Sequence, residues 1–229
     1  MATGAVLSKK RPPAASRRDL MATAIDCFAV HGYQGTTIDM IARAAGVTKG
    51  ALYYHFKDKE DLLFAAVRDR VSDFEERVVA AVTPVGDPVR ALRQIGDACL
   101  FVATRNNHRR FLLTLMVEAI DSYPELATQF RDIMQRFRAF VASIVRIGQQ
   151  QQVFRFDVEP AAAAAILVAG IMGAEIQHYQ DSTAVNLEDV MRSLLDATFA
   201  WLCVRAGSQQ LDGDDAVERP ASAEQAARG

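Results

Sequence analysis

TTIDMIARAAGVTKGALYYHFKDKEDLL, residues 36–63, is the stretch that decides how the N-terminal part of this chain folds. It predicts two short helices that meet at Gly46, a residue that can adopt the positive φ of a tight corner. Thr36 or Thr37 can cap the first helix, and Thr48 can cap the second. Two short helices joined by a tight turn, on a third supporting helix, form the helix-turn-helix arrangement.

The second of these helices is expected to bury one face and to expose the other. Leu52 and Phe56 lie on the buried face, and Val47 is an apolar plug after the turn. The opposite face carries a lysine, hydroxyl groups and an imidazole, which suit phosphate oxygens and base edges. An ordinary helical hairpin with a polar face would show the same pattern. The side chains on this face are Thr48, Lys49, Ala51, Tyr54 and His55.

Helical patterns continue on both sides of this stretch. A supporting helix is expected from Ser16, with apolar residues at helical spacing and Gly32 as a left-handed stop. On the other side, Asp58 caps a long helix whose apolar positions continue to about Val82. The buried residues of the supporting helix are expected to be Met21, Ala24, Ile25 and Phe28.

The rest of the chain predicts more helices and no series of strands, so the fold class is all-α. After a Pro- and Gly-containing break at residues 83–88, helices are expected at 88–105, 107–121, 122–152, 160–179 and 186–205. Gln149 to Gln152 is expected to be a solvated helix end. Residues 1–15 are expected to form a flexible basic arm, and residues 207–229 a disordered tail with little to bury.

The charge of the chain is unevenly distributed. Residues 1–59 contain nine Lys and Arg and four acidic residues, a net charge of +5, while the remainder carries −7. A basic head on an acidic body indicates a polyanionic partner for the head alone. A chance split of solvated charges would give the same numbers, so charge alone does not separate the two interpretations.

Composition and motifs exclude several classes of protein. Three cysteines, none in a CxxC pair, favour a reducing, cytoplasmic location and argue against a zinc site. The longest apolar run, Ala161 to Ala174, is shorter than the roughly 20 residues of a membrane span, and the N-terminus lacks the apolar core of a signal peptide. The chain lacks GxSxG, HExxH, GxGxxG and P-loop patterns. No enzymatic activity, metal or cofactor is therefore expected.

The quoted stretch resembles the signature of the TetR family of bacterial transcriptional regulators. The resemblance covers roughly residues 16–64: the Thr-Thr start, the Ala-Gly-Val turn, Leu-Tyr-x-His-Phe and the Lys-x-x-Leu that begins the long helix. It implies a three-helix DNA-binding head (residues 16–57) and a larger helical body (residues 58–206), joined by a long helix. It further implies that the body binds a small ligand and dimerises, and that the protein acts as a repressor.

The resemblance also assigns DNA contacts to individual positions. Thr37 would meet a phosphate at the start of the first short helix, and Lys59 would anchor one at the start of the long helix. The remaining positions lie on the second short helix, which would enter the major groove. Lys49, Gly50 and Ala51 would lie at base edges, and Tyr53, Tyr54 and His55 would meet phosphates or bases.

The last two long helices are apolar on more than one face. The helix near 160–179 has a stripe of small residues and large apolar residues in other directions, and the helix near 187–205 has two apolar stripes. A helix without a polar face must be covered on both sides, which predicts a homodimer that pairs these helices. A fully internal hairpin in a monomer is the alternative. The two stripes of the second helix are Val190, Leu194, Ala197 and Trp201, and Met191, Leu195, Phe199 and Leu202.

Aromatic and methionine residues are dense between positions 101 and 140, and most are expected in the core. Some are expected to line an apolar cavity for a small, mainly apolar organic effector, with Arg109, Arg110, Glu118, Gln177 or His178 near its mouth. The two arginines could pair with an acidic group, although solvated surface charge is their simpler role. The candidate ligand-binding residues are Phe111, Met116, Phe137, Met172 and His178.

These observations predict a ligand-responsive regulator that binds a palindromic double-stranded DNA operator as a homodimer, in the cytoplasm and without membrane contact. A helical scaffold or adaptor would fit the body but would leave the head motif unexplained. An all-α enzyme would need catalytic motifs that the sequence does not contain.

Overall fold

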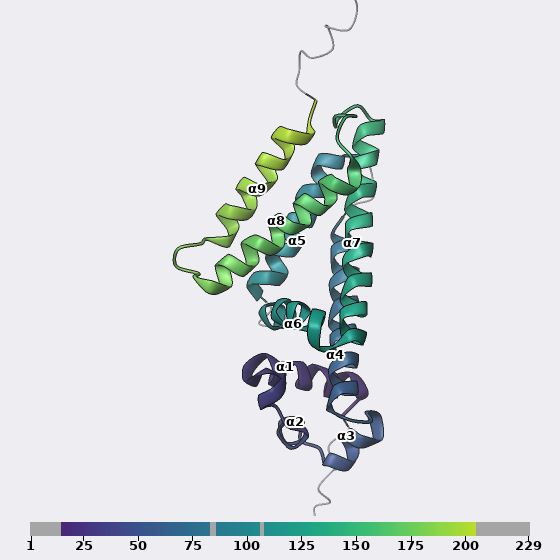
Figure 1. Cartoon of the computed structure of the whole chain (residues 1–229), viewed down its shortest axis with the longest axis vertical. Coiled ribbons are helices and arrows are strands. Elements are labelled where there is room, and N and C mark those ends of the chain that lie inside the picture. Colours follow the sequence, from purple (N-terminus) through teal and green to yellow (C-terminus); the bar gives the residue numbers. More distant parts are fainter. Residues whose placement is uncertain (1–14, 83–85, 106–107, 205–229) are drawn as a thin grey trace, which may run out of the picture.

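A computed structural model describes residues 15–82, 86–105 and 108–204 of the 229-residue chain, and these residues form nine helices (Figure 1). The predicted arm at residues 1–15, apart from Ala15, and the predicted tail at 207–229 lie outside the described residues. The described part confirms the all-α class. The helices are α1 (Arg17–Gly35), α2 (Ile38–Ala44), α3 (Lys49–His55), α4 (Lys59–Ala81), α5 (Pro88–Arg105), α6 (His108–Ser122), α7 (Pro124–Gln150), α8 (Pro160–Gln180) and α9 (Leu187–Leu202).

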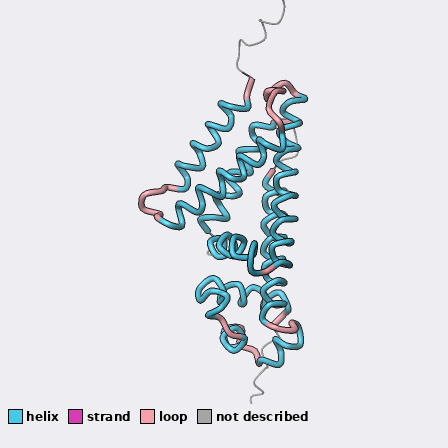
Figure 2. Tube along the Cα trace, in the orientation of Figure 1, coloured by secondary structure: helices cyan, strands magenta, loops and turns pink. Residues whose placement is uncertain are grey.

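The helices divide into a small head and a long body. Figures 1 and 2 show α1, α2 and α3 gathered at one end, with α4 and α7 running side by side away from them. Helices α8 and α9 pack against each other and slant away from α7, and α6 lies across the junction and contacts α1. Helix α4 is continuous from the head into the body, so the two parts are joined by a helix rather than by a loop.

The core of the head extends into the body. The four residues expected on the buried face of α1 are all buried, and they pack in one cluster with Ile41 of α2 and Leu52 of α3. The same cluster contains Leu115 of α6 and Leu126 of α7, which are almost fully buried. Displacement of α6 or α7 would therefore disturb packing beneath the DNA-binding helices.

The turn between α2 and α3 forms as the sequence predicts. Gly32 and Gly46 have φ angles of 72° and 68°, values that an L-amino acid with a side chain rarely adopts. Gly32, however, is a kink within α1 rather than its end, because the helix runs on to Gly35. Thr37 caps α2, because its hydroxyl accepts a hydrogen bond from the backbone N–H of Met40. The alternative cap, Thr36, is instead fully buried and donates from its hydroxyl to the carbonyl oxygen of Gly32 at 2.7 Å.

Two expectations for the body need correction. Gln150, Gln151 and Gln152 are exposed, as expected, but Gln149 is buried, and its side-chain amide donates to the carbonyl oxygens of Arg155 and Val158. These bonds tie the end of α7 to the segment that leads into α8. Helix α9 ends at Leu202 rather than near residue 205, because Cys203 forms an antiparallel bridge with Phe154.

By length and apolar composition alone, α8 passes the test for a membrane-spanning helix. The core helix of a soluble protein passes the same test, so this is weak evidence for a membrane. Helix α8 packs against α7 and α9 and buries seven residues, including Glu175. Its contacts with α7 and α9 place one face of the helix in the core of the body.

Candidate DNA-binding surface and ligand cavity

Helix α3 presents its aromatic residues to solvent on a rigid base. Leu52 and Phe56 are almost completely buried and hold the helix against α1 and α2. Tyr54 and Tyr53 lie on the other side, with exposed fractions of 83% and 54%. The exposed side chains of α3 can therefore meet a DNA groove without any change in the core beneath them.

The other candidate contacts lie on or beside the same helix. Lys49 and Gly50 are exposed at the start of α3, whereas Ala51 and His55 are half-buried. The Lys49 ammonium forms an ion pair of 2.6 Å with the carboxylate of Asp39 on α2. Both side chains are about half exposed, so a phosphate or a base edge can compete with Asp39 for Lys49. Thr37 is exposed at the start of α2, and its hydroxyl proton remains free to donate after the capping bond.

Lys59 has an intramolecular role that sequence reasoning missed. Its ammonium donates to the carbonyl oxygens of Tyr33 and Thr36, each at 3.0 Å, and lies 4.3 Å from the centre of the Tyr33 ring. These contacts fix the end of α1 to the start of α4. An ammonium has three protons, so one remains for a phosphate.

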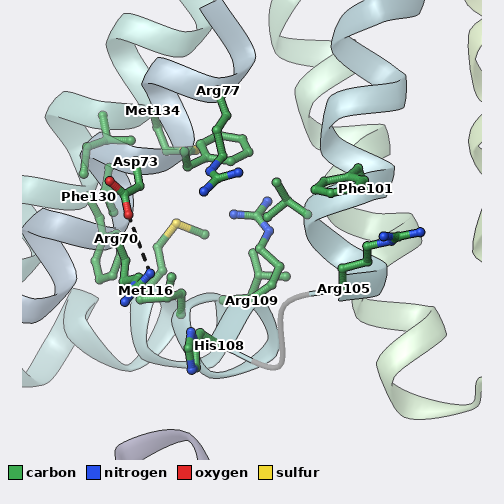
Figure 3. A pocket seen from close by; sticks show the side chains of 16 residues that line it. Arg70, Asp73, Arg77, Phe101, Arg105, His108, Arg109, Met116, Phe130 and Met134 are labelled. Carbon is green, nitrogen blue, oxygen red and sulfur yellow. Dashed lines mark ion pairs between the residues drawn. The ribbon is translucent and has the colours of Figure 1, made fainter. Parts of the chain in front are cut away.

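A cavity of about 390 Å³ lies in the body between α4, α5, α6 and α7 (Figure 3). This volume is within the usual range for small-molecule sites, about 300–1,000 Å³. Its wall is apolar over much of its area, with charged side chains at intervals. The apolar lining residues are Val71, Phe74, Phe101, Val102, Leu112, Leu113, Met116, Phe130, Ile133 and Met134, and the charged or titratable ones are Arg70, Asp73, Arg77, Arg105, His108 and Arg109.

The structure does not bring the five sequence-predicted ligand residues together. Met116 lines the cavity. Phe111 instead stacks on Phe28 of the head, and Phe137 is buried in the body core against Phe74. Met172 packs at the edge of that core, and His178 bonds through Nδ1 to the carbonyl oxygen of Val185. Helical periodicity identified these residues as apolar or inward-facing but could not give their partners in space.

The cavity wall contains a buried ion pair that sequence reasoning missed. The Nε and Nη2 atoms of Arg109 lie 3.0 and 2.8 Å from Oε2 of Glu175, and the Arg109 side chain is only 13% exposed. Glu175 is fully buried, and its Oε1 has no hydrogen-bond partner among the described residues. Burial raises the pKa of Glu175 above its usual value, against the opposing effect of Arg109. Solvated surface charge is therefore the wrong role for Arg109.

The spacing along α8 contains a signal for this pair. Val168, Ile171 and Glu175 lie three and four positions apart and share the buried face of the helix. A carboxylate on a buried face requires a cation or hydrogen-bond donors from another element. The sequence alone does not show that α6 supplies the cation.

Two contacts connect the cavity wall to the head. His108, a lining residue at the start of α6, forms a hydrogen bond through Nε2 with the carboxylate of Asp26 on α1. One turn further along α6, the Phe111 ring stacks on Phe28 with centroids 6.2 Å apart. Arg109, which lies between the cavity and Glu175, follows His108 directly in the sequence. A shift at the start of α6 would therefore move residues that contact the cavity and residues that contact α1.

The outward face of α8 and α9 remains uncovered within the chain. On α9, the stripe from Met191 to Leu202 is buried, while Val190 and Ala197 of the other stripe are exposed. On α8, Ile166 is 54% exposed, and nothing lies within 4 Å of the space beside Gly173. Both helices are therefore apolar on a face that the rest of the described chain does not cover.

Comparisons with known proteins agree with this architecture. A family model described as "Bacterial regulatory proteins, tetR family" matches residues 20–66, which include α2, α3 and most of α1. A second, described as "Tetracyclin repressor-like, C-terminal domain", matches residues 88–194 of the body. The chain belongs to the TetR family. Members of this family are transcription factors rather than enzymes.

Individual relatives in the TetR family match only part of the chain, at modest sequence identity. The HTH-type transcriptional regulator AcrR of Shigella flexneri is 31% identical over 115 residues, which cover 49% of this chain and 53% of that protein. The HTH-type transcriptional repressor AcnR of Corynebacterium glutamicum is 39% identical over 66 residues, 29% of this chain and 35% of that protein. These matches thus span about a third to about half of each relative's length.

A solved structure extends the likeness to the body. A putative transcriptional regulator from Saccharomonospora viridis, in complex with choline, superposes with a TM-score of 0.74 at 27% identity. The match covers 82% of this chain and 98% of that one. The likeness in fold therefore extends over head and body together.

Proposed function

We propose that this protein is a cytoplasmic transcriptional repressor that binds a palindromic operator as a homodimer and releases it when a small organic effector occupies the body. The observation that carries this proposal is α3, whose tyrosines and lysine face solvent while its other side is locked in the head core. The family matches and the name of AcnR, a repressor, support the same function.

On the DNA, the eight residues at and beside α3 would divide between bases and backbone. Lys49, Gly50 and Ala51 would approach base edges in the major groove, where a helix fits. Thr37 and Lys59 would position the helix on phosphates, which carry most of the affinity but little sequence information. Tyr53, Tyr54 and His55 would meet phosphates or bases near the end of α3.

The homodimer would form through the uncovered face of α8 and α9. Two copies of this face would make a four-helix contact related by a two-fold axis, which makes the same apolar surface complementary to itself. Such a dimer would place two recognition helices on one side of the duplex, about 34 Å or a related spacing apart. A palindromic operator is the sequence counterpart of that symmetry.

The effector would bind in the cavity between α4, α5, α6 and α7. The apolar lining favours a mainly apolar molecule, and the choline complex of the S. viridis relative supports a small organic ligand in a body of this shape. Release requires that the ligand favour a conformation in which the heads are misplaced. The contacts of α6 with Asp26 and Phe28 offer a physical route.

Binding of fluorescent duplexes that tile the DNA upstream of the gene tests this proposal. We expect one palindromic segment to bind much more tightly than a scrambled duplex, with an affinity that falls steeply as salt rises. Equal affinity for the palindrome and the scrambled duplex would exclude operator recognition. A monomer by light scattering at micromolar concentration would exclude the dimeric arrangement.

A further inference from the structure

We propose that the cavity between α4, α5, α6 and α7 takes an amphiphilic organic anion, and that Arg77 and Arg109 bind its negatively charged group. This inference rests on the proposed function, in which the cavity holds the effector, and it specifies the charge of that effector.

The charges around the cavity are unbalanced. Among the described residues that line it, four are arginines and only Asp73 is acidic. Asp73 is already shared, because one carboxylate oxygen lies 2.8 Å from Arg18 and the other 3.6 Å from Arg70. Arg105 lies over the ring of Phe101, and Figure 3 shows its guanidinium directed away from the cavity. Arg77 and Arg109 are therefore the cations left to act on a ligand.

Arg77 lies on α4 without an ionic partner from the described residues. Figure 3 shows its guanidinium directed into the cavity, toward the guanidinium of Arg109 on the opposite side. Two like charges that face each other repel, and an anion between them converts that repulsion into two attractions. Guanidinium groups also match the geometry of a carboxylate or a phosphate, because they donate parallel hydrogen bonds.

Arg109 is held in position while part of it remains available. Its Nε and Nη2 atoms face Glu175, and its guanidinium lies 5.2 Å from the centre of the Phe74 ring. An arginine has five donor protons, so the Nη1 protons are not needed for the Glu175 contact. Glu175 is therefore a positioning residue: it orients Arg109 from behind and leaves one edge for the ligand.

The rest of the wall suits the apolar part of such a ligand. Phe74, Met116 and Phe130 contribute apolar surface from three different helices. Met and aromatic side chains adapt to an irregular apolar body. A quaternary ammonium of the same size would fill this volume equally well, but it would meet the guanidinium of Arg77, which has no ionic partner among the described residues, and the Nη1 donors of Arg109. The distribution of charge, rather than volume, selects the anion.

Calorimetry on the full chain with matched ligands tests the proposal. The ligands are decanoate and 2-naphthoate, their neutral amides, and decyltrimethylammonium. We expect each carboxylate to bind at least about tenfold more tightly than its amide, the gain expected for charge-assisted hydrogen bonds. We expect the ammonium to bind more weakly than either neutral amide.

Two variants separate the site from unspecific binding. Arg77→Gln should reduce the preference for carboxylate over amide to less than about threefold, because one of the two guanidinium groups is lost. Arg68→Gln removes an exposed arginine on the same helix that does not line the cavity, and it should leave the preference unchanged. Arg77 is itself exposed, so its replacement should not prevent folding.

The proposal is overturned if neither carboxylate binds at millimolar concentration, if the amides or the ammonium bind as tightly, or if Arg77→Gln keeps the full preference. Operator release, measured in parallel, separates the proposal that the cavity holds the effector from the proposal that the effector is an anion. An ammonium that binds and releases DNA would preserve the effector cavity and exclude the anion. Carboxylates that bind through Arg77 but leave DNA affinity unchanged would preserve the anion site and exclude the release mechanism.

Discussion

The head and the body hold their functional side chains in opposite ways. In the head, Tyr54 projects into solvent, while separate residues such as Leu52 and Phe56 supply the stability beneath it. In the body, Glu175 is fully buried and Arg109 is only 13% exposed; Arg109 lines the cavity, and its ion pair with Glu175 also holds α6 to α8. Function and stability should therefore be separable by mutation in the head and coupled in the body.

The dimer face of the body should show the largest effect. Ile166→Glu places a carboxylate on the proposed contact face of α8 and α9, once from each subunit, where the contact would bury it. We expect the dimer dissociation constant to rise by more than about 1,000-fold. Val30→Glu, on the more exposed Val30 of the head, is the matched control and should leave the mass in sedimentation unchanged. If the Ile166→Glu protein is still a dimer, the interface lies on another face of the protein.

The buried ion pair should give the next largest effect. Arg109→Met leaves Glu175 buried without its cation, and we expect the free energy of unfolding in urea to fall by about 3–5 kcal/mol. Arg110→Met changes the exposed neighbour on the same helix and should cost less than about 0.5 kcal/mol. Equal losses for the two variants would show that the Arg109–Glu175 contact does not stabilise the body.

Replacing Tyr54, the more exposed tyrosine of α3, should change DNA binding but not stability, the reverse of the effect expected for Arg109. We expect Tyr54→Ala to weaken operator binding by about 10- to 100-fold through the loss of a phosphate or base contact. Its free energy of unfolding should change by less than about 0.5 kcal/mol, because the side chain is exposed. Fluorescence anisotropy and urea unfolding on the same samples measure both. Unchanged operator affinity would remove Tyr54 from the proposed contacts.

Lys59 is an exception to the separation of function and stability in the head. It is a proposed phosphate contact, and its ammonium also forms hydrogen bonds that stabilise the head. We expect Lys59→Ala to cost about 1.5–3 kcal/mol of stability, since hydrogen bonds from its ammonium to Tyr33 and Thr36 are lost. Operator affinity should fall as well. Lys57→Ala, at an exposed lysine nearby, serves as the control for stability. A Lys59→Ala protein as stable as wild type would show that these two hydrogen bonds contribute little.

The smallest effect should appear in the pH dependence of the body. Burial raises the pKa of Glu175 in the folded protein, so the folded state retains this proton to higher pH than the unfolded state does. The stability that Glu175 contributes is therefore fully present below about pH 4 and is lost as pH rises through the pKa of the folded protein.

Glu175→Gln lacks this titration and provides the reference. We expect the free energy of unfolding of wild type, relative to Glu175→Gln, to decrease as pH rises above 4. An increase with pH would mean that Arg109 lowers the pKa of Glu175 and that attraction within the pair outweighs its burial.

The head was the easier part to predict, because its signals are local. The corner at Gly46, the caps Thr37 and Thr48 and the buried Phe56 each depend on residues within a few positions of themselves. The choice between Thr36 and Thr37 needed the structure, because it depends on whether α1 reaches Thr36. The DNA contacts themselves remain predictions.

The body was harder to predict, because its site is made by contacts between distant residues. Arg109 and Glu175 lie 66 positions apart, and neither position alone shows that α6 and α8 meet. Gln149 was assigned to solvent from its polar neighbours, yet a loop that folds back over α7 buries it. Of the five candidate ligand residues, Met116 lines the cavity and the other four do not. The other four were misplaced because apolar periodicity does not distinguish a core residue from a residue of a cavity wall.

The central claim is that occupancy of the body cavity controls DNA binding by the head. Its most direct test is the operator dissociation constant, measured by fluorescence anisotropy with the cavity empty and with it saturated by a ligand that calorimetry shows to depend on Arg77. We expect saturation to weaken operator binding about 100-fold, which requires about 2.7 kcal/mol of coupling, a usual value for allosteric proteins. An operator dissociation constant that stays the same within twofold at saturation would contradict the claim.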